Sequence, residues 1–159
     1  MQESLMQVLR REEKPELPKI LSHIKELDIR EETAHHKLSN VAHFFPLTGN
    51  QKTVRFIKGK EKIHQPKRVG VFFSGGQAAG GHNVVIGLFN ALKTLNPKSQ
   101  LFGFLGGSDG LLKNEWIELK ENILSYYLNQ GGFDLLGSSR TKIEDSNQFQ
   151  QTAATVKEL

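Results

Sequence analysis

Two pairs of glycines lie close together near the middle of the chain, in the run Ser74-Gly75-Gly76-Gln77-Ala78-Ala79-Gly80-Gly81. Glycine lets the backbone approach a ligand without a clash of Cβ atoms. The apolar residues that follow have helical spacing, and the free amides at a helix N-terminus attract anions. This pattern therefore predicts a loop that binds a phosphate group.

The spacing of these glycines differs from that of two common phosphate loops. It reads GGxxxGG, which is neither the dinucleotide-binding GxGxxG nor the Walker A GxxxxGK[ST], and no lysine follows Gly81. A tight turn that only serves the fold is the alternative, because glycine also permits close packing. His82, next to the loop, could contact a ligand or make a structural hydrogen bond at the start of the helix.

Two further glycine loops follow apolar runs later in the chain. The first is Gly106-Gly107-Ser108-Asp109-Gly110, and the second is Gly137-Ser138-Ser139-Arg140-Thr141-Lys142. Arg140 is the only arginine after Arg68, and a guanidinium suits bidentate recognition of phosphate oxygens. The alternatives are an ordinary surface arginine and, for Asp109, a solvated turn residue.

These loops must be held by the elements around them. Residues 69–73 and 100–105 have the composition of buried strands, and residues 84–95 carry a helical stripe of apolar side chains. We expect a short extended segment at 116–119, a helix near 123–128, and a last helix that Ser146 caps and that bears Phe149, Ala153, Val156 and Leu159. The pattern predicts a three-layer α/β fold, with a mainly parallel sheet flanked by helices and the loops at the carboxyl ends of its strands.

The residues before this body have a different composition. Residues 1–68 contain 14 Lys and Arg against 9 Asp and Glu, whereas residues 69–159 contain 7 against 8 and hold 13 of the 15 glycines. We therefore divide the chain into an N-terminal extension, 1–68, and an α/β body, 69–159. The extension is predicted to be a basic, partly helical arm, with helices near Leu5 and over 17–27 and an extended segment at 53–57.

The basic arm has two interpretations. A nucleic-acid site is one, but the arm has no zinc-finger spacing and no aromatic RNA-binding motif, so a solvated surface is the preferred interpretation. A metal site is not expected, because the histidines of the arm lack nearby paired carboxylates at a recurrent spacing. They are His23, His35, His36, His43 and His64.

Composition excludes several classes of protein. The chain has 159 residues and no cysteine, so it has neither disulfides nor thiol chemistry nor cysteine-ligated zinc. No apolar run approaches the roughly 18 residues of a membrane span, and no signal-peptide pattern is visible. We expect a cytoplasmic protein.

Taken together, the three loops resemble a known family. Phe73–Asn83 is similar to the first phosphate-binding loop of the phosphofructokinases, and its Gly-Gly-His-Asn ending resembles the long, pyrophosphate-dependent branch. Gly103–Leu111 is similar to the second loop of that branch, and Gly131–Lys142 to its next motif. The motifs occur in family order and cover the chain from about Val69 to its end, and the extension also suits the long branch.

The resemblance implies a phosphofructokinase-like fold and a reversible glycolytic reaction. A phosphoryl group would pass from pyrophosphate to the 1-hydroxyl of fructose 6-phosphate, with Mg²⁺ as cofactor. Donor phosphates would be held by Gly75, Gly76 and Arg140. The weaker candidates for the same role are Gly80, Gly81, His82, Asn83, Gly107 and Asp109. Ala79 stands where the family often has proline, which reduces loop rigidity but removes no contacting group.

The resemblance also implies that parts of the enzyme are not among these residues. Family members continue with a Gly-Gly-Asp-type loop that holds the Mg²⁺ ligand and a Thr-x-Asp-x-Asp segment with the catalytic base, and neither is found up to Leu159. The fold is thus expected to be incomplete, with no catalytic or metal-binding residue in this chain. Because phosphoryl transfer needs positioned groups and metal-assisted charge stabilisation, we expect the isolated chain to be inactive.

Other functions stay open at this point. The chain could be a non-catalytic phosphate-binding module or a regulatory subunit of a phosphofructokinase-like assembly, or a nucleic-acid-binding protein that uses the basic arm. For the enzyme, the expected partners are pyrophosphate and fructose 6-phosphate. The full-length protein is expected to form a homo-oligomer and not to bind a membrane.

Overall fold

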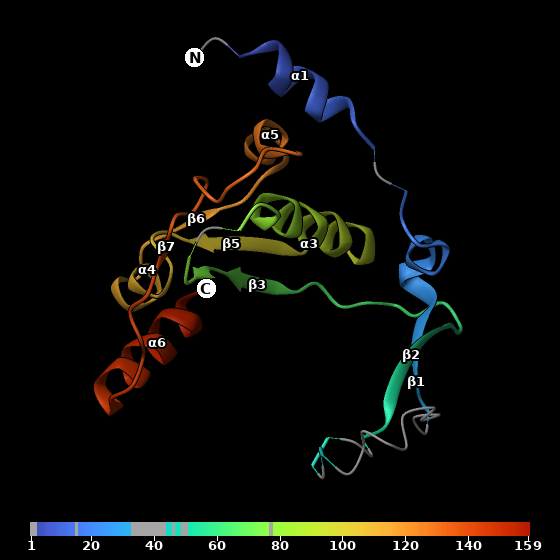
Figure 1. Cartoon of the computed structure of the whole chain (residues 1–159). Helices are drawn as coiled ribbons and strands as arrows, with labels where there is room; N and C mark the ends of the chain where they lie inside the picture. Colours follow the sequence, from blue (N-terminus) through green and yellow to red (C-terminus); the bar gives the residue numbers. More distant parts are fainter. Residues whose placement is uncertain (1–2, 15, 33–43, 46, 49–50, 77) are drawn as a thin grey trace. The chain divides into compact units, whose positions relative to one another are not determined.

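The computed structural model describes residues 3–14, 16–32, 44–45, 47–48, 51–76 and 78–159. The chain divides into two compact units, Met1–Pro15 with His64–Leu159 and, separately, Glu16–Ile63. The first unit contains the three glycine loops (Figure 1). The boundary at residue 68, which rests on composition, stays a prediction. Within the described residues, no helix has the length and apolar character that crossing a membrane requires.

A small sheet forms the centre of the first unit. Its strands are β3 (Arg68–Val71), β5 (Gln100–Phe104) and β6 (Trp116–Glu118), in the order β3-β5-β6. β3 runs parallel to β5, and β6 runs antiparallel to β5. A separate parallel pair joins β4 (Phe73–Ser74) to β7 (Ser138–Ser139). Two of these three pairings are parallel, in agreement with the predicted α/β fold.

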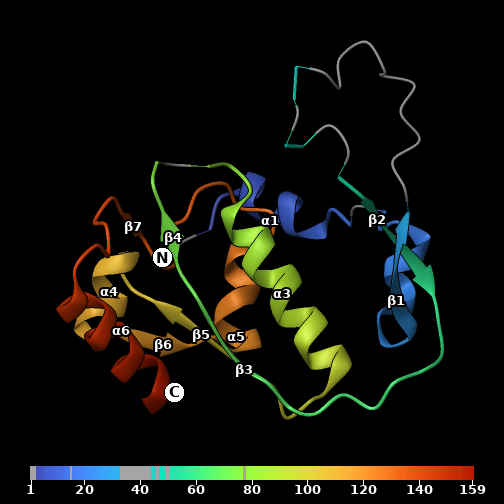
Figure 2. The same cartoon turned by 90° about the horizontal axis from the view of Figure 1, so that it is seen from below.

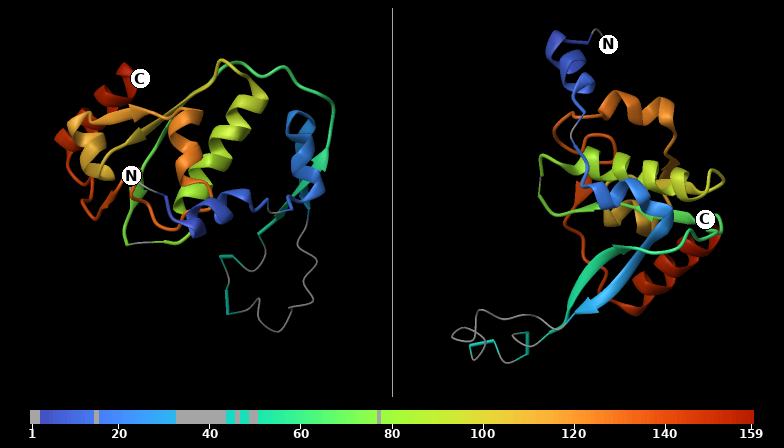
Figure 3. Two further views of the ribbon diagram at one scale, coloured as in Figure 1. Left: turned by 90° about the horizontal axis from the view of Figure 1, so that it is seen from above. Right: turned by 90° about the vertical axis from the view of Figure 1, so that its right-hand side faces the viewer.

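Helices cover both faces of this sheet. On one side lie α3 (Gly81–Leu95) and α5 (Glu121–Leu124), and α5 continues into the 3₁₀ turn η2 (Ser125–Tyr127). On the other side lie α4 (Ser108–Lys113) and α6 (Ser146–Glu158). Figures 1 and 2 show this layering, and the right-hand view of Figure 3 shows α3 and α6 on opposite sides of the sheet.

The alternation of side chains along β5 explains why both faces are covered. Successive strand residues point to opposite faces, and Leu101 joins the cluster formed with α3 and α5, whereas Phe102 and Phe104 pack with Leu111 of α4 and with Leu159 after α6. All five side chains are buried. Burial of each contributes roughly 1.5–3 kcal/mol.

Helix α1 (Leu5–Glu12) belongs to the first unit but adds nothing to its core. It begins with a capping box, in which the Ser4 hydroxyl accepts from the Gln7 amide and the Gln7 side chain accepts from the Ser4 amide. No residue of α1 is buried. Its attachment to the rest of the unit is polar and is described below.

The second unit is built around an antiparallel hairpin. Strands β1 (Leu27–Glu32) and β2 (Thr53–Lys58) pair in register from Leu27 opposite Lys58 to Glu32 opposite Thr53. The 3₁₀ helix η1 (Lys19–Glu26) precedes them. Ion pairs engage many of the basic side chains of this unit, namely Lys52–Glu31 at 2.9 Å, Arg55–Glu32 at 3.8 Å, Lys58–Glu26 at 3.1 Å and Lys62–Asp28 at 3.2 Å.

The structure corrects parts of the prediction. The cap of α6 is Asp145 and not Ser146, because the Asp145 carboxylate accepts from the Gln148 amide at 2.8 Å while Gln148 reaches back to the Asp145 amide. The helix predicted over 17–27 is a 3₁₀ helix that ends at Glu26. Strand β1 and helix α4 were not predicted, and α4 occupies part of the predicted second glycine loop.

Candidate phosphate-binding site

The first glycine loop, residues 74–81, connects β4 to α3. Gly75 has φ +95°, a left-handed conformation that side chains rarely adopt. Its N–H donates to the Ser139 carbonyl at 3.0 Å, and its carbonyl accepts from the Ser138 hydroxyl at 3.0 Å. The backbone of the first loop is therefore fixed directly to the third loop, beside Arg140.

The second loop meets both others at Gly107. A Cβ atom at this position would lie 2.5 Å from the Phe73 carbonyl oxygen and 2.5 Å from the Ser139 amide nitrogen. Only a residue without a side chain fits between two strands at such a distance. The neighbouring Gly106 amide donates to the Leu136 carbonyl at 2.7 Å, which attaches the second loop to the segment before the third.

Ser108 completes this junction, and the sequence reasoning missed it. Its side chain is buried, and its hydroxyl donates to the Thr141 carbonyl. Because a hydroxyl has one proton, the 2.9 Å contact with Ser139 is a hydrogen bond that the Ser139 hydroxyl donates. A small polar residue directly after two glycines was the only available signal, and it does not distinguish a buried serine from a solvated one.

Arg140 lies over the first loop. Its Nη2 atom is 3.7 Å from the position that a Cβ would take on Gly76. The residue is exposed, and within the described part of the chain it has no hydrogen bond or ion pair. A cation held beside a glycine backbone, with no carboxylate to neutralise it, is suited to an anion such as a phosphate group.

The N-terminus of α3 faces the same loop. Gly80 occupies the cap position and supplies no side-chain hydrogen bond, and the first bond of the helix runs from the Val84 amide to the Gly80 carbonyl at 3.1 Å. The amides of the first helical turn before Val84 have no partner within the helix. They add a second group of donors for an anion.

His82 and Asn83 are engaged by protein groups instead. His82 is 0% exposed, its Nδ1 lies 3.1 Å from the Gln130 carbonyl, and its Nε2 accepts from the Leu135 amide at 3.3 Å. Nδ1 is therefore the protonated nitrogen, and the ring is neutral. Asn83 pairs with Asn129. Of the two roles considered for His82, the structure displays the structural hydrogen bond.

Asp109 stands in the first turn of α4, partly exposed, and its side chain has no hydrogen bond or ion pair among the described residues. Searching those residues finds no group of three or more His, Cys, Asp or Glu side chains that could hold a metal ion. His23 lies 3.9 Å from Glu26, and His35, His36 and His43 are outside the described residues.

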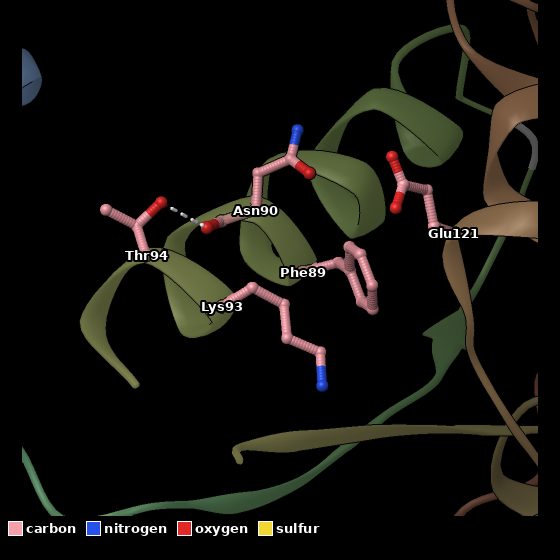
Figure 4. Close-up of a pocket in the computed structure, with 5 residues that line it drawn as sticks. All are labelled: Phe89, Asn90, Lys93, Thr94 and Glu121. Carbon is pink, nitrogen blue, oxygen red and sulfur yellow. Dashed lines mark hydrogen bonds between the residues drawn. The ribbon is translucent and has the colours of Figure 1, made fainter. Parts of the chain in front are cut away.

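A separate open pocket lies along the second half of α3. Figure 4 shows its lining residues, which are Phe89, Asn90, Lys93, Thr94 and Glu121. The Lys93 ammonium donates to the carbonyls of Pro97 and Ser99, and the Thr94 hydroxyl donates to the Asn90 carbonyl. None of the predicted site residues lines this pocket.

The α/β fold with its three joined loops is consistent with a fold of the phosphofructokinase type. No family model matches the chain. Curated proteins do match it. A pyrophosphate–fructose 6-phosphate 1-phosphotransferase of Porphyromonas gingivalis is 39% identical over 161 residues, which cover 100% of this chain and 29% of that protein.

Two other relatives give the same result. The enzyme of that name from Treponema pallidum is 40% identical over 96% of this chain and 29% of its own length. The alpha subunit from Solanum tuberosum is 38% identical over 97% of this chain and 27% of its own length. The chain thus spans less than a third of the length of these relatives. It is related to an N-terminal portion of the pyrophosphate-dependent phosphofructokinases, which confirms the family resemblance of its loops.

Proposed function

We propose that the chain is the donor-binding portion of a pyrophosphate–fructose 6-phosphate 1-phosphotransferase. In the whole protein, a phosphoryl group would pass reversibly from pyrophosphate to the 1-hydroxyl of fructose 6-phosphate, as a step of glycolysis in the cytoplasm. The observation that carries this proposal is the convergence of three glycine loops beside Arg140, whose side chain has no partner among the residues that the structure describes. The relatives of the same name, matched over nearly the whole chain, support it.

The loop residues would have different tasks. Gly75, whose N–H and carbonyl are bonded to the third loop, would leave space for the donor phosphates, and Gly76 would present its backbone to them. Arg140, beside Gly76, would contact the phosphate oxygens. The first turn of α3, with Gly80 and Gly81, would add amide donors. Positioned donors of this kind stabilise the charge of a transferring phosphoryl group.

Mg²⁺ would be the cofactor of the whole enzyme, where it stabilises charge on the phosphates. The described residues do not fit a Mg²⁺ site by themselves, because they bring no three potential ligands together. Asp109 is a single carboxylate beside the loops and does not replace such a set. Because transfer needs metal-assisted charge stabilisation and positioned groups, we expect the isolated chain to bind donor phosphate without forming fructose 1,6-bisphosphate.

A regulatory role in an assembly of subunits is the second candidate. Its support is that the relatives include both an alpha and a beta subunit of the Solanum tuberosum enzyme, each 38% identical to this chain. For either candidate we propose an oligomeric full-length protein. The ion pairs of the basic residues in the second unit favour the solvated-surface interpretation of the arm over nucleic-acid binding.

Calorimetric titration with inorganic pyrophosphate tests the proposal. Replacing Arg140 by alanine should weaken binding at least about tenfold, because hydrogen bonds to charged groups contribute roughly 1.5–3 kcal/mol. The matched control is Lys142→Ala on the same loop, since Lys142 is already paired with Glu144 at 3.4 Å. Equal binding by the Arg140→Ala variant and the unaltered chain would refute the assignment of Arg140, and no binding by the unaltered chain would refute the proposal.

A further inference from the structure

The segment Asn129–Gly132, here called the bridging segment, lies along the first turn of α3. The strongest contact joins Asn129 to Asn83. The Asn129 amide donates to the Asn83 Oδ1 at 2.8 Å, and the Asn83 Nδ2 donates to the Asn129 Oδ1 at 2.9 Å. Asn129 has φ +57°, a left-handed conformation that few residues other than glycine and asparagine tolerate. Both the side chain and the backbone amide of Asn129 therefore bond to Asn83 while its backbone is left-handed.

The contacts continue along the bridging segment in sequence order. The Gln130 carbonyl accepts from the Nδ1 of His82, the residue before Asn83. The Gly132 carbonyl lies 3.1 Å from the position that a Cβ would take on Gly81, so these two backbones are in close contact. Each residue from Gly81 to Asn83 therefore meets the bridging segment, directly after the first glycine loop.

The other side of the bridging segment holds helix α1. The Asn129 Nδ2 donates to the carbonyls of Arg10 at 2.7 Å and Glu13 at 2.8 Å, and the Gln130 Nε2 donates to the Gln7 carbonyl at 3.2 Å. The Asn129 side chain thus binds the C-terminal end of α1, where the Arg10 carbonyl also accepts from the Glu13 amide, and the Gln130 side chain binds the helix one turn earlier. Figure 1 shows the segment that follows α5 between α1 and α3.

Burial does not explain why α1 is attached here. None of its residues is buried, and Leu5 and Leu9 are 74% and 49% exposed. What α1 does contact is the side chains of Asn129 and Gln130, the two residues that hold the first turn of α3 through the Asn129 side chain and amide and the Gln130 carbonyl. We infer that α1 positions the first turn of α3, and with it the first glycine loop, through Asn129 and Gln130.

In this arrangement His82 and Asn83 are positioning residues that need not touch a phosphate. The chain of contacts runs from the end of α1, through the bridging segment, to the helix whose free amides face the loop. The consequence for ligand binding rests on the proposed function, because it requires that this loop binds pyrophosphate. The effect of α1 on the stability of the first turn of α3 does not require a ligand, and the experiment measures the two effects separately.

The experiment measures hydrogen exchange of backbone amides in the ligand-free chain. Asn83→Ala removes the contact on the α3 side. Asn129→Asp keeps an acceptor for Asn83 and tolerates the left-handed conformation, but it loses the donor to α1. The control is Asn90→Ala, an exposed asparagine on the same helix whose side chain makes no hydrogen bond among the described residues.

Both test variants should speed exchange at Val84 and Val85 by about tenfold, because each loses one or two hydrogen bonds of roughly 0.5–1.5 kcal/mol. Amides of β5, which report global unfolding, should change far less, and Asn90→Ala should leave Val84 and Val85 unchanged. Unchanged exchange in Asn83→Ala would overturn the inference, and unchanged exchange in Asn129→Asp would overturn the role of α1. A uniform acceleration that includes β5 would also overturn it, by showing a general loss of stability.

Pyrophosphate titration of Asn83→Ala gives the second readout. The dissociation constant should rise several-fold, with Asn90→Ala unchanged. Faster exchange at Val84 and Val85 with an unchanged dissociation constant would overturn the inference that this turn positions the ligand site. If the unaltered chain binds no pyrophosphate, the proposed function fails, and the exchange data still decide whether α1 holds α3.

Discussion

The junction of the three loops at Gly107 makes a quantitative prediction about the substitution Gly107→Ala. A Cβ atom here would lie 2.5 Å from the Phe73 carbonyl oxygen and 2.5 Å from the Ser139 amide nitrogen. Both are backbone atoms, one in β4 directly before the first loop and one in the third loop, so neither can rotate away. The residue also has φ +69°, so alanine adds conformational strain to the clash.

A neighbouring glycine with open space around it provides the comparison. Gly106 has φ +67°, but no atom lies within 4 Å of its Cβ position. Gly106→Ala should therefore cost only the left-handed strain of about 1–2 kcal/mol. Gly107→Ala carries a larger backbone strain, because the combination of φ +69° and ψ −134° is tolerated essentially by glycine alone, and it adds an overpacking cost of about 1–3 kcal/mol. The difference between the two variants therefore measures the backbone conformation of Gly107 and the packing around it together.

Urea unfolding followed by tryptophan fluorescence provides the assay. The chain has a single tryptophan, Trp116, which lies in the first unit on β6 and packs against Phe102 at 5.2 Å between ring centroids. The Gly107→Ala variant should unfold at a clearly lower urea concentration than Gly106→Ala, with the same slope. Free energies of unfolding that agree within about 0.5 kcal/mol would refute the packed junction, since distant surface changes stay within that range.

Two further predictions concern stability. Asp145→Ala removes the cap of α6 and should lower the melting temperature by about 2–4 °C, from a loss of about 1 kcal/mol, whereas Ser146→Ala should have no such effect; equal effects in thermal scans would contradict the cap assignment. Hydrogen bonds from Gln100 and Lys120 lower the pKa of Glu118 below its ordinary value. On acidification, the Glu118 carboxylate is therefore protonated at a higher pH in the unfolded chain than in the folded one. Its contribution to stability is fully present above its ordinary pKa and is lost as the pH falls through the lower pKa of the folded state. Glu118→Gln should therefore lose less stability than the unaltered chain between about pH 6 and pH 3, and a larger loss in melting scans would contradict the sign.

The parts of the fold that follow from local sequence were predictable. The stripe of apolar residues from Val85 to Leu92 gave α3, and the apolar run before Gly106 gave β5, because a buried helix face and a strand with both faces covered each leave a local pattern. The first loop was also placed correctly, since a glycine run after an apolar strand is a strong sign of a turn, whereas α4 and β7 occupy parts of the segments predicted as the second and third loops.

The elements that were missed depend on distant partners. Strand β1 has only two apolar residues, Leu27 and Ile29, so its sequence does not indicate a strand. Its extended conformation is stabilised by the pairing with β2. Helix α4 begins with residues typical of turns, and it is held by Leu111 against Phe104 and Leu159. Neither interaction is visible in a local window of sequence.

The candidate site shows the same limit at the level of single residues. The glycines and Arg140 were found from residue type alone, because their chemistry does not depend on a partner. The buried Ser108 and the bridging Asn129 were not found, because their roles are set by hydrogen bonds to residues 31 to 119 positions away. His82 was recognised as ambiguous, and its complete burial could be learned only from the packed structure.

Amide chemical-shift mapping during a titration with inorganic pyrophosphate tests the central claim most directly. If the three loops form one donor-binding site, the largest shifts should fall together at Gly75, Gly76, Gly107 and Arg140 and saturate with a single dissociation constant. The basic residues of β2, including Lys58, should shift little at moderate salt, because their charges are already paired. Shifts confined to those basic residues, or none in the loops, would contradict the account.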